Sequence, residues 1–196
     1  MLPVFCDVDG VLRKQKGMPI SAETREAVMS FRGIFNMITG APLAHVPADI
    51  PAHKIFAEAG GVRVIPDQKG ERYVFEKGRA AVLELRRQLS ILQEDGMVET
   101  PYGTLIVEGP RYASLTLLFG RPPHYRGCVT SASMEEVSAR IDRLARELGL
   151  TLSVGHDTTY EYLNIFSVTK GSTVAAAMQE AGWGHVYFLE DTDLEA

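Results

Sequence analysis

The first third of the chain alternates short apolar runs with one amphipathic stretch. Residues 2–6 and 34–38 are largely apolar runs of the length of a buried strand, and a third, shorter strand is predicted at residues 54–56. Between the first two runs, Ser21 opens a predicted helix that Gly33 ends. The apolar stripe expected on this helix consists of Ala27, Val28 and Phe31. Strand, helix, strand is the unit of a parallel sheet with a right-handed crossover, and such sheets place ligands at strand ends.

The pattern changes after residue 71. An amphipathic helix is predicted from the spacing of Val82, Leu85, Leu89 and Leu92, and strands are predicted at 97–100, 105–108 and 112–119. A capping box at Ser133 to Glu136 starts a second helix, which carries Val137, Ile141, Leu144 and Leu148. Two further strands, 150–154 and 160–166, flank a predicted hairpin turn at 155–159. These elements predict an antiparallel sheet with two helices on one face.

The end of the chain returns to the first pattern. Residues 172–181 form a predicted helix ending at Gly182, and residues 185–189 form a last apolar strand. We therefore predict an α/β fold in which a Rossmann-like parallel-sheet core, residues 1–70 and 167–196, is interrupted by an inserted α+β module, residues 71–166.

Composition narrows the classes of function. The 196 residues are 45% hydrophobic and 23% charged, with a formal net charge of −5 and basic residues that are scattered along the chain. This argues against a nucleic-acid-binding surface, which needs clustered Lys and Arg. Cys6 and Cys128 are the two cysteines, and we find neither an apolar run long enough to span a membrane nor a secretion signal. We expect a cytoplasmic protein in which Cys6 packs in the core.

Two carboxylates follow the first predicted strand. Asp7 and Asp9 are spaced i and i+2, so in an extended segment their side chains point the same way, and Gly10 provides a turn directly after them. Converging carboxylates suit Mg²⁺, which can hold a phosphate while one acid attacks phosphorus and the other exchanges protons. The alternative is a solvated Asp turn at a strand end.

Three further segments add groups that suit a phosphate. Thr39-Gly40 follows the second strand, and Pro42 suits the first turn of a helix there, so the hydroxyl and nearby backbone N–H groups could face an anion. Lys170 precedes the resumed helix and is explained if it faces an anion. Glu190, Asp191 and Asp193 follow the last strand. Taken singly, each has an ordinary alternative: a capped turn, a solvated lysine and a solvated tail.

These residues occur in a definite order: acids after strand one, Thr after strand two, Lys before the last helix and acids after the last strand. This order resembles that of the haloacid dehalogenase-like (HAD) phosphatase superfamily. The inserted module resembles the αββαββ cap of class IIB sugar-phosphate phosphatases. The resemblance implies that Asp7 forms an aspartyl-phosphate and that Asp9 is the general acid/base. It also implies that Thr39, Gly40 and Lys170 bind the phosphoryl group. The Mg²⁺ ligands that it implies are Asp7, Asp9 through its backbone carbonyl, Glu190 and Asp191.

The resemblance further implies a small phosphorylated substrate, such as a sugar phosphate or a phosphoglycerate sugar, read by the cap. The cap residues that could contact it are Arg111, His124, His156 and Tyr160. No nucleic-acid or membrane partner is expected. Glu190-Asp191 is a compressed variant of the usual acidic motif. Three alternatives remain open: a phosphomannomutase-like phosphomutase, a phosphate-binding protein with weak turnover and, as a poorer fit, a response-regulator receiver.

Overall fold

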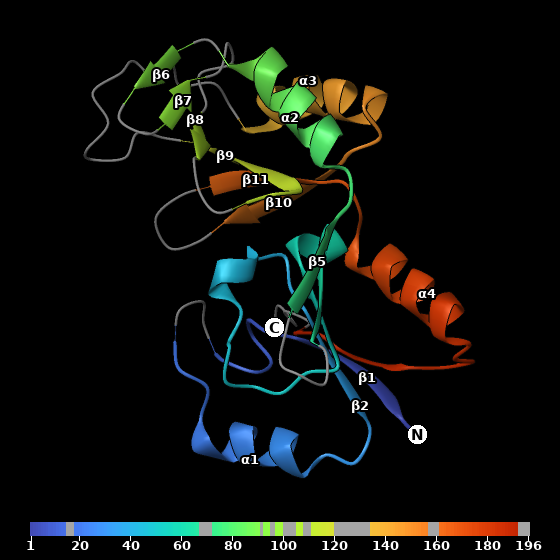
Figure 1. The fold of residues 1–196 in the computed structure, drawn as a ribbon. Helices are drawn as coiled ribbons and strands as arrows, with labels where there is room; N and C mark the ends of the chain where they lie inside the picture. Colours follow the sequence, from blue (N-terminus) through green and yellow to red (C-terminus); the bar gives the residue numbers. More distant parts are fainter. Residues whose placement is uncertain are drawn as a thin grey trace. The chain divides into compact units, whose positions relative to one another are not determined.

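The computed structural model describes residues 1–14, 18–66, 72–90, 92–94, 97–99, 105–107, 111–119, 134–156 and 161–191. The chain forms two compact units (Figure 1): Met1–Glu76 together with Thr169–Ala196, and Lys77–Val168. The first boundary lies later than the predicted residue 70 because the strand Arg72–Glu76 pairs with the first unit's sheet. At the second boundary, the Ser167 hydroxyl donates to the Lys77 carbonyl at 2.6 Å, which ties both ends of the inserted unit together.

The first unit is built on a sheet of strand order β12-β1-β2-β3-β4-β5. Its four parallel strands are β12 (Tyr187–Leu189), β1 (Pro3–Asp7), β2 (Ile34–Ile38) and β3 (Lys54–Ala57). Two antiparallel strands, β4 (Val62–Pro66) and β5 (Arg72–Glu76), extend it. The predicted α/β class is confirmed, whereas this antiparallel extension was not predicted: neither strand was recognised in the sequence.

Helix α4 (Lys170–Ala181) covers one face of this sheet. The buried side chains of Val174 and Ala177 pack on Phe5, Ile38 and Phe56 of three adjacent parallel strands. The helix begins at Lys170, two residues before the predicted start at Ser172, because Thr169 and Ser172 form a capping box: each side-chain oxygen accepts the backbone N–H of the other. Lys170 therefore lies in the first helical turn.

Helix α1 (Ala22–Ser30) has no buried residue, so the predicted apolar stripe on it is wrong. Ser21 caps its N-terminus as predicted, through a 3.1 Å bond from the Thr24 N–H, but the helix ends at Ser30 and not at Gly33. Phe31 adopts an extended conformation, and its ring packs edge-on against Phe35 at 6.4 Å. The aromatic side chain thus joins the start of β2 and not a helical stripe.

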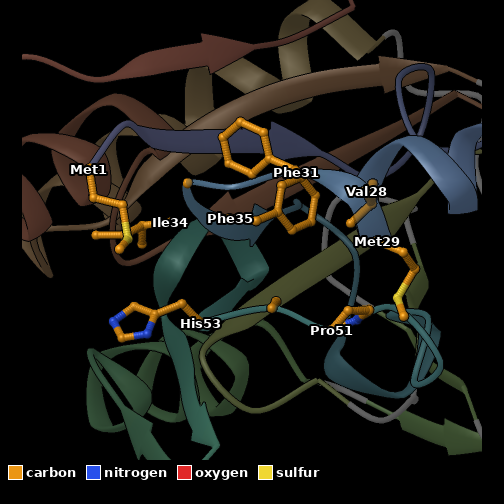
Figure 2. A pocket seen from close by; sticks show the side chains of 10 residues that line it. Met1, Val28, Met29, Phe31, Ile34, Phe35, Pro51 and His53 are labelled. Carbon is orange, nitrogen blue, oxygen red and sulfur yellow. The ribbon is translucent and has the colours of Figure 1, made fainter.

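A pocket of about 320 Å³ lies at this end of the sheet. It is bordered by α1, the turn to β2 and the segment before β3, and Figure 2 shows Phe31 and Phe35 from its lining together with Met29 and His53. These side chains lie at the amino ends of the parallel strands. The acids and the threonine singled out in the sequence follow the carboxyl ends, so this pocket is separate from the candidate chemistry.

The second unit is α+β, with a sheet of order β10-β11-β9-β8-β7-β6. Helices α2 (Arg79–Leu89) and α3 (Met134–Glu147) lie together on one face of it (Figure 1), and their buried side chains share one apolar core with β8, β9 and β11. The strands are β6 (Leu92–Glu94), β7 (Met97–Glu99), β8 (Leu105–Val107), β9 (Ser114–Leu118), β10 (Thr151–His156) and β11 (Glu161–Phe166).

Four strands therefore separate the two helices within the described segments, so the αββαββ pattern is wrong in this detail. Leu92, assigned to the first helix from its spacing, lies in β6, because α2 ends at Leu89 with Ser90 extended. Gly155 and His156, expected in a turn, continue β10 and pair with β11. Across all described residues, no helix is long and apolar enough to cross a membrane.

Candidate active site

The register of the parallel strands brings the candidate residues to one sheet edge. Cys6 of β1 is level with Leu189 of β12, and Asp7 is level with Ile38 of β2. Glu190 and Thr39 directly follow those neighbours. Since parallel strands end at the same edge, the acids after β1 and β12 and the threonine after β2 meet there.

Asp7 is the buried carboxylate at the centre of this edge, 8% exposed. Its Oδ1 accepts the Val8 N–H at 2.8 Å, and its Oδ2 accepts from the Lys170 ammonium. The same ammonium donates to Glu190 Oε1 at 2.8 Å. Lys170 therefore bridges the carboxylate that ends β1 and the one that directly follows β12, and the predicted closeness of these three residues is observed.

Burial raises the pKa of the Asp7 carboxyl, and the nearby Lys170 and the Val8 N–H only partly offset this effect. For Lys170, burial acts to lower the pKa, but the hydrogen bonds to Asp7 and Glu190 outweigh it and the net pKa is raised. The lysine therefore stays charged at neutral pH. A charged lysine suits the binding of a phosphate dianion.

Asp9 lies in the tight loop after β1, where its Oδ1 accepts from Arg13 Nε at 2.6 Å. Arg13 is buried and also donates through Nη2 to the carbonyl of His45 at 3.1 Å, so it links the loops that follow β1 and β2. The sequence analysis missed Arg13. The pair forms in a tight loop and not on a helix, so a spacing of four residues gave no signal for it.

Thr39 is buried directly after β2, with its backbone N–H bonded to the Phe56 carbonyl at 2.9 Å. Its Oγ1 accepts the Ala41 N–H at 3.0 Å, which leaves the hydroxyl hydrogen available for donation to a ligand. Gly40 follows it in the turn. The prediction of a helix after Pro42 is wrong: Leu43–His45 forms a single turn of 3-10 helix, which is too short to offer a helix dipole to an anion.

A strained turn after β3 supports this threonine. Glu58 and Ala59 both have positive φ, 52° and 59°, and the Ala59 N–H donates to the Thr39 carbonyl at 2.8 Å. The Ala59 carbonyl accepts from the Thr173 hydroxyl of α4 at 2.7 Å. The turn thus joins the Thr39 loop to the helix that carries Lys170. Sequence reasoning missed Glu58 and Thr173, and no local pattern distinguishes them.

The acids after β12 lie close to the loop after β1. A Cβ placed on Gly10, whose φ is +86°, would come within 2.4 Å of Asp191 Oδ2, so the Asp191 carboxylate lies directly against this glycine. Oxygen ligands of this kind suit Mg²⁺, and the acids from both strands approach one region. Within the described residues, however, no three His, Cys, Asp or Glu side chains already form a metal-binding group. Asp193 lies outside those residues.

The predicted substrate-binding residues fall in the second unit. Arg111 is half-buried and its Nη1 donates to the Ser114 hydroxyl at 2.9 Å. His156 belongs to β10, but its side chain is not among those described. His124 and Tyr160 lie outside the described residues. Their roles stay predictions.

Comparison with known proteins shows which folds share this architecture. BT1666 from Bacteroides thetaiotaomicron, a phosphatase of the haloalkanoate (HAD) superfamily, aligns with a TM-score of 0.56 at 15% identity, over 93% of this chain and 74% of that one. The HAD subclass IIB sugar phosphatase BT4131 aligns with a TM-score of 0.51 at 11% identity, over 93% and 76%.

A Plasmodium falciparum IMP-nucleotidase aligns with a TM-score of 0.54 at 10% identity, where this chain covers 92% of its own length but 56% of the nucleotidase. No model of a protein family matches the sequence, and no curated protein matches it. The similarity is therefore one of three-dimensional structure: the chain has the fold of the HAD-superfamily phosphatases.

Proposed function

We propose that this protein is a Mg²⁺-dependent phosphatase that hydrolyses a small phosphomonoester. The observation that carries the proposal is the contact of Lys170 with Asp7 and Glu190 at the carboxyl ends of β1 and β12. This contact joins the proposed nucleophile to a cation that we propose binds phosphate. The HAD-phosphatase fold supports the same assignment.

The reaction has two balanced steps. A carboxylate oxygen of Asp7 attacks phosphorus, the bond to the ester oxygen breaks, and Asp9 protonates the leaving oxygen. Asp9 then takes a proton from water, whose oxygen attacks the aspartyl-phosphate and releases inorganic phosphate with Asp7 regenerated. Lys170 and the Thr39 hydroxyl hold the phosphoryl oxygens, and Gly40 follows Thr39 in the same turn.

Asp7, the backbone carbonyl of Asp9, Glu190 and Asp191 are the groups that would hold Mg²⁺. The ion would neutralise phosphate charge and hold the phosphoryl group in line with Asp7. Lys170 already holds the Glu190 carboxylate at 2.8 Å. We therefore infer that ion binding and the contact between Lys170 and Glu190 compete.

The unit Lys77–Val168 is proposed to act as a cap that reads the leaving group. A sugar phosphate or a phosphoglycerate sugar is the proposed substrate class, supported by the structural likeness to the sugar phosphatase BT4131. Arg111, His124, His156 and Tyr160 remain the proposed contacts. The compartment proposed is the cytoplasm, and the partner is a small molecule, not nucleic acid or membrane.

Phosphate release from a panel of sugar phosphates and phosphoglycerate sugars, with Mg²⁺ and with a chelator, tests the proposal. Native protein should release phosphate in a Mg²⁺-dependent manner, and Asp7→Asn should not. Asp49→Asn is the matched control, because Asp49 is an exposed aspartate of the same unit that pairs with Arg25. Retained turnover in Asp7→Asn would remove the nucleophile assignment, and equal loss in Asp49→Asn would point to misfolding.

A phosphate-binding protein with weak turnover is the second candidate. The ammonium of Lys170 between Asp7 and Glu190 favours it, because that contact must weaken before both acids can serve a metal. Calorimetry with inorganic phosphate separates the two. Phosphate binding without hydrolysis of any ester would select this candidate over the phosphatase.

A further inference from the structure

Arg13 is a buried cation whose charge faces the proposed acid/base. Its side chain is 7% exposed and donates from Nε to Asp9 Oδ1 at 2.6 Å. A buried guanidinium needs a charged or polar partner, since an unpaired one would lose its hydration without compensation. Asp9 and the His45 carbonyl are these partners.

The backbone holds this pair in place independently of the side chains. The Gly10 N–H donates to the Arg13 carbonyl at 2.8 Å, and the Arg13 N–H donates to the Val8 carbonyl at 3.0 Å. The loop after β1 therefore closes on itself around Asp9. Through Nη2, Arg13 also reaches the His45 carbonyl in the loop after β2, which anchors the guanidinium on both sides.

The two oxygens of Asp9 have different surroundings. Oδ1 is held by Arg13, whereas Oδ2 has no hydrogen-bond partner among the residues that the structure describes. The Asp9 side chain is 30% exposed, so the carboxylate is accessible to a ligand. The terminal torsion of an aspartate side chain has a broad distribution of angles. A charge-assisted hydrogen bond to one carboxylate oxygen therefore restricts the direction in which the other oxygen points.

We propose that Arg13 is the positioning residue for Asp9: it holds Oδ1 so that Oδ2 can exchange a proton with the leaving oxygen. This inference rests on the proposed phosphatase function. Proton transfer requires the two heavy atoms to lie within hydrogen-bond reach, so loss of the anchor slows the steps that need the proton. Steps that do not need it are affected far less.

Leaving groups of different basicity provide the test. Alkyl phosphates expel a strongly basic oxygen and need the proton, whereas 4-nitrophenyl phosphate expels a weakly basic phenolate and needs it little. The quantity compared is kcat/KM, which reports the attack of Asp7 and the departure of the leaving group. A loss of phosphate affinity or of folded protein lowers kcat/KM equally for both substrates. The ratio of the two kcat/KM values therefore isolates the role of the proton.

For Arg13→Met we expect kcat/KM to fall about 10²-fold on the alkyl phosphate, with a much smaller fall on 4-nitrophenyl phosphate. Arg13→Lys, which keeps the charge, should recover part of the difference. Arg25→Met, which removes an exposed arginine of the same unit paired with Asp49, is the control and should leave the ratio unchanged. Thermal unfolding verifies that each variant is folded, and Arg13→Lys carries the test where Arg13→Met does not fold.

A double variant decides whether Arg13 acts through Asp9. In an Asp9→Asn background, Arg13→Met should produce no further change in the ratio, because the group that it positions is already lost. Equal losses on both substrates in Arg13→Met, or an undiminished second effect in the double variant, would overturn the inference while leaving the phosphatase intact. Native protein inactive on both substrates would overturn both.

Discussion

Lys170, the first residue of α4, donates a hydrogen bond to Asp7, the last residue of β1, across 163 positions of sequence. The contact forms because α4 packs on the face of the sheet that includes β1, through Val174 against Phe5. The capping box at Thr169 places the start of the helix at the level of the strand end. A packing arrangement of apolar side chains therefore determines the position of a charged group.

Removing that charge should impair phosphate binding and turnover. We expect Lys170→Met to lower kcat about 10²-fold, as for loss of one preorganised donor to a phosphoryl oxygen, and to weaken the affinity for inorganic phosphate. Lys54→Met is the matched control, because Lys54 is a lysine of β3 in the same unit and pairs with Glu180. Steady-state kinetics and calorimetry measure the two effects, and unchanged kinetics in Lys170→Met would exclude this lysine from the site.

Gly10 should tolerate no side chain. Its φ of +86° is disfavoured for other residues, and an added Cβ would lie 2.4 Å from Asp191 Oδ2. We expect Gly10→Ala to lower the free energy of unfolding by about 1–2 kcal/mol from backbone conformation alone, and to reduce Mg²⁺-dependent turnover by moving Asp191. Gly184→Ala should be neutral, since a Cβ there has no neighbour within 4 Å. Urea unfolding compares the two, and equal stability would show that Asp191 does not lie against Gly10.

Cys6 should be chemically inert in the folded protein. Burial, with a contribution from the Asp7 charge, raises the pKa of its thiol to about 12, and the residue is 2% exposed. Since the thiolate is the reactive form, we expect iodoacetamide to leave Cys6 unmodified at neutral pH and to modify it after denaturation. Mass spectrometry of a Cys128→Ser variant isolates this residue. Rapid labelling of the native protein would contradict the buried position.

The contact of Glu180 with Lys54 and Arg63 should make stability weakly dependent on pH. Burial acts to raise the pKa of Glu180, but the two cations outweigh it and the net pKa is lowered. A lowered folded-state pKa means that the stabilisation is present above the ordinary glutamate value of 4.5 and disappears as pH falls below it.

Glu180→Gln should therefore reduce the free energy of unfolding at pH 7 by less than about 1 kcal/mol, since the carboxylate is half-exposed. The difference from the native protein should vanish in acid. Glu26→Gln on α1 is a control for loss of an exposed glutamate. Thermal unfolding at several pH values measures this, and a difference that grows in acid would contradict the ion pair.

The local sequence pattern was sufficient to predict the strands and helices that have a strong periodic or apolar signal. The strand at 34–38 was predicted to the residue, and β1, β3 and α4 lie within two residues of their predicted limits. The strands β4, β5 and β6 were missed. β4 and β5 carry the β-branched and aromatic residues typical of a strand, but Gly60-Gly61 and Pro66 were interpreted as the end of the first sheet. Which sheet such strands join depends on their pairing with neighbouring strands.

By itself the sequence determined which chemical groups follow which strand, because apolar runs and the polar residues that end them are local features. Asp7, Thr39, Lys170 and Glu190 were recognisable from this order. The contacts of Arg13 with Asp9 and His45, of Asp191 with Gly10 and of Thr173 with Ala59 were decided by the tertiary structure. The contact of Arg13 with Asp9 depends on how the loop after β1 closes. The others depend on how loops and helices pack, and their distances are set by contacts between residues far apart in the chain.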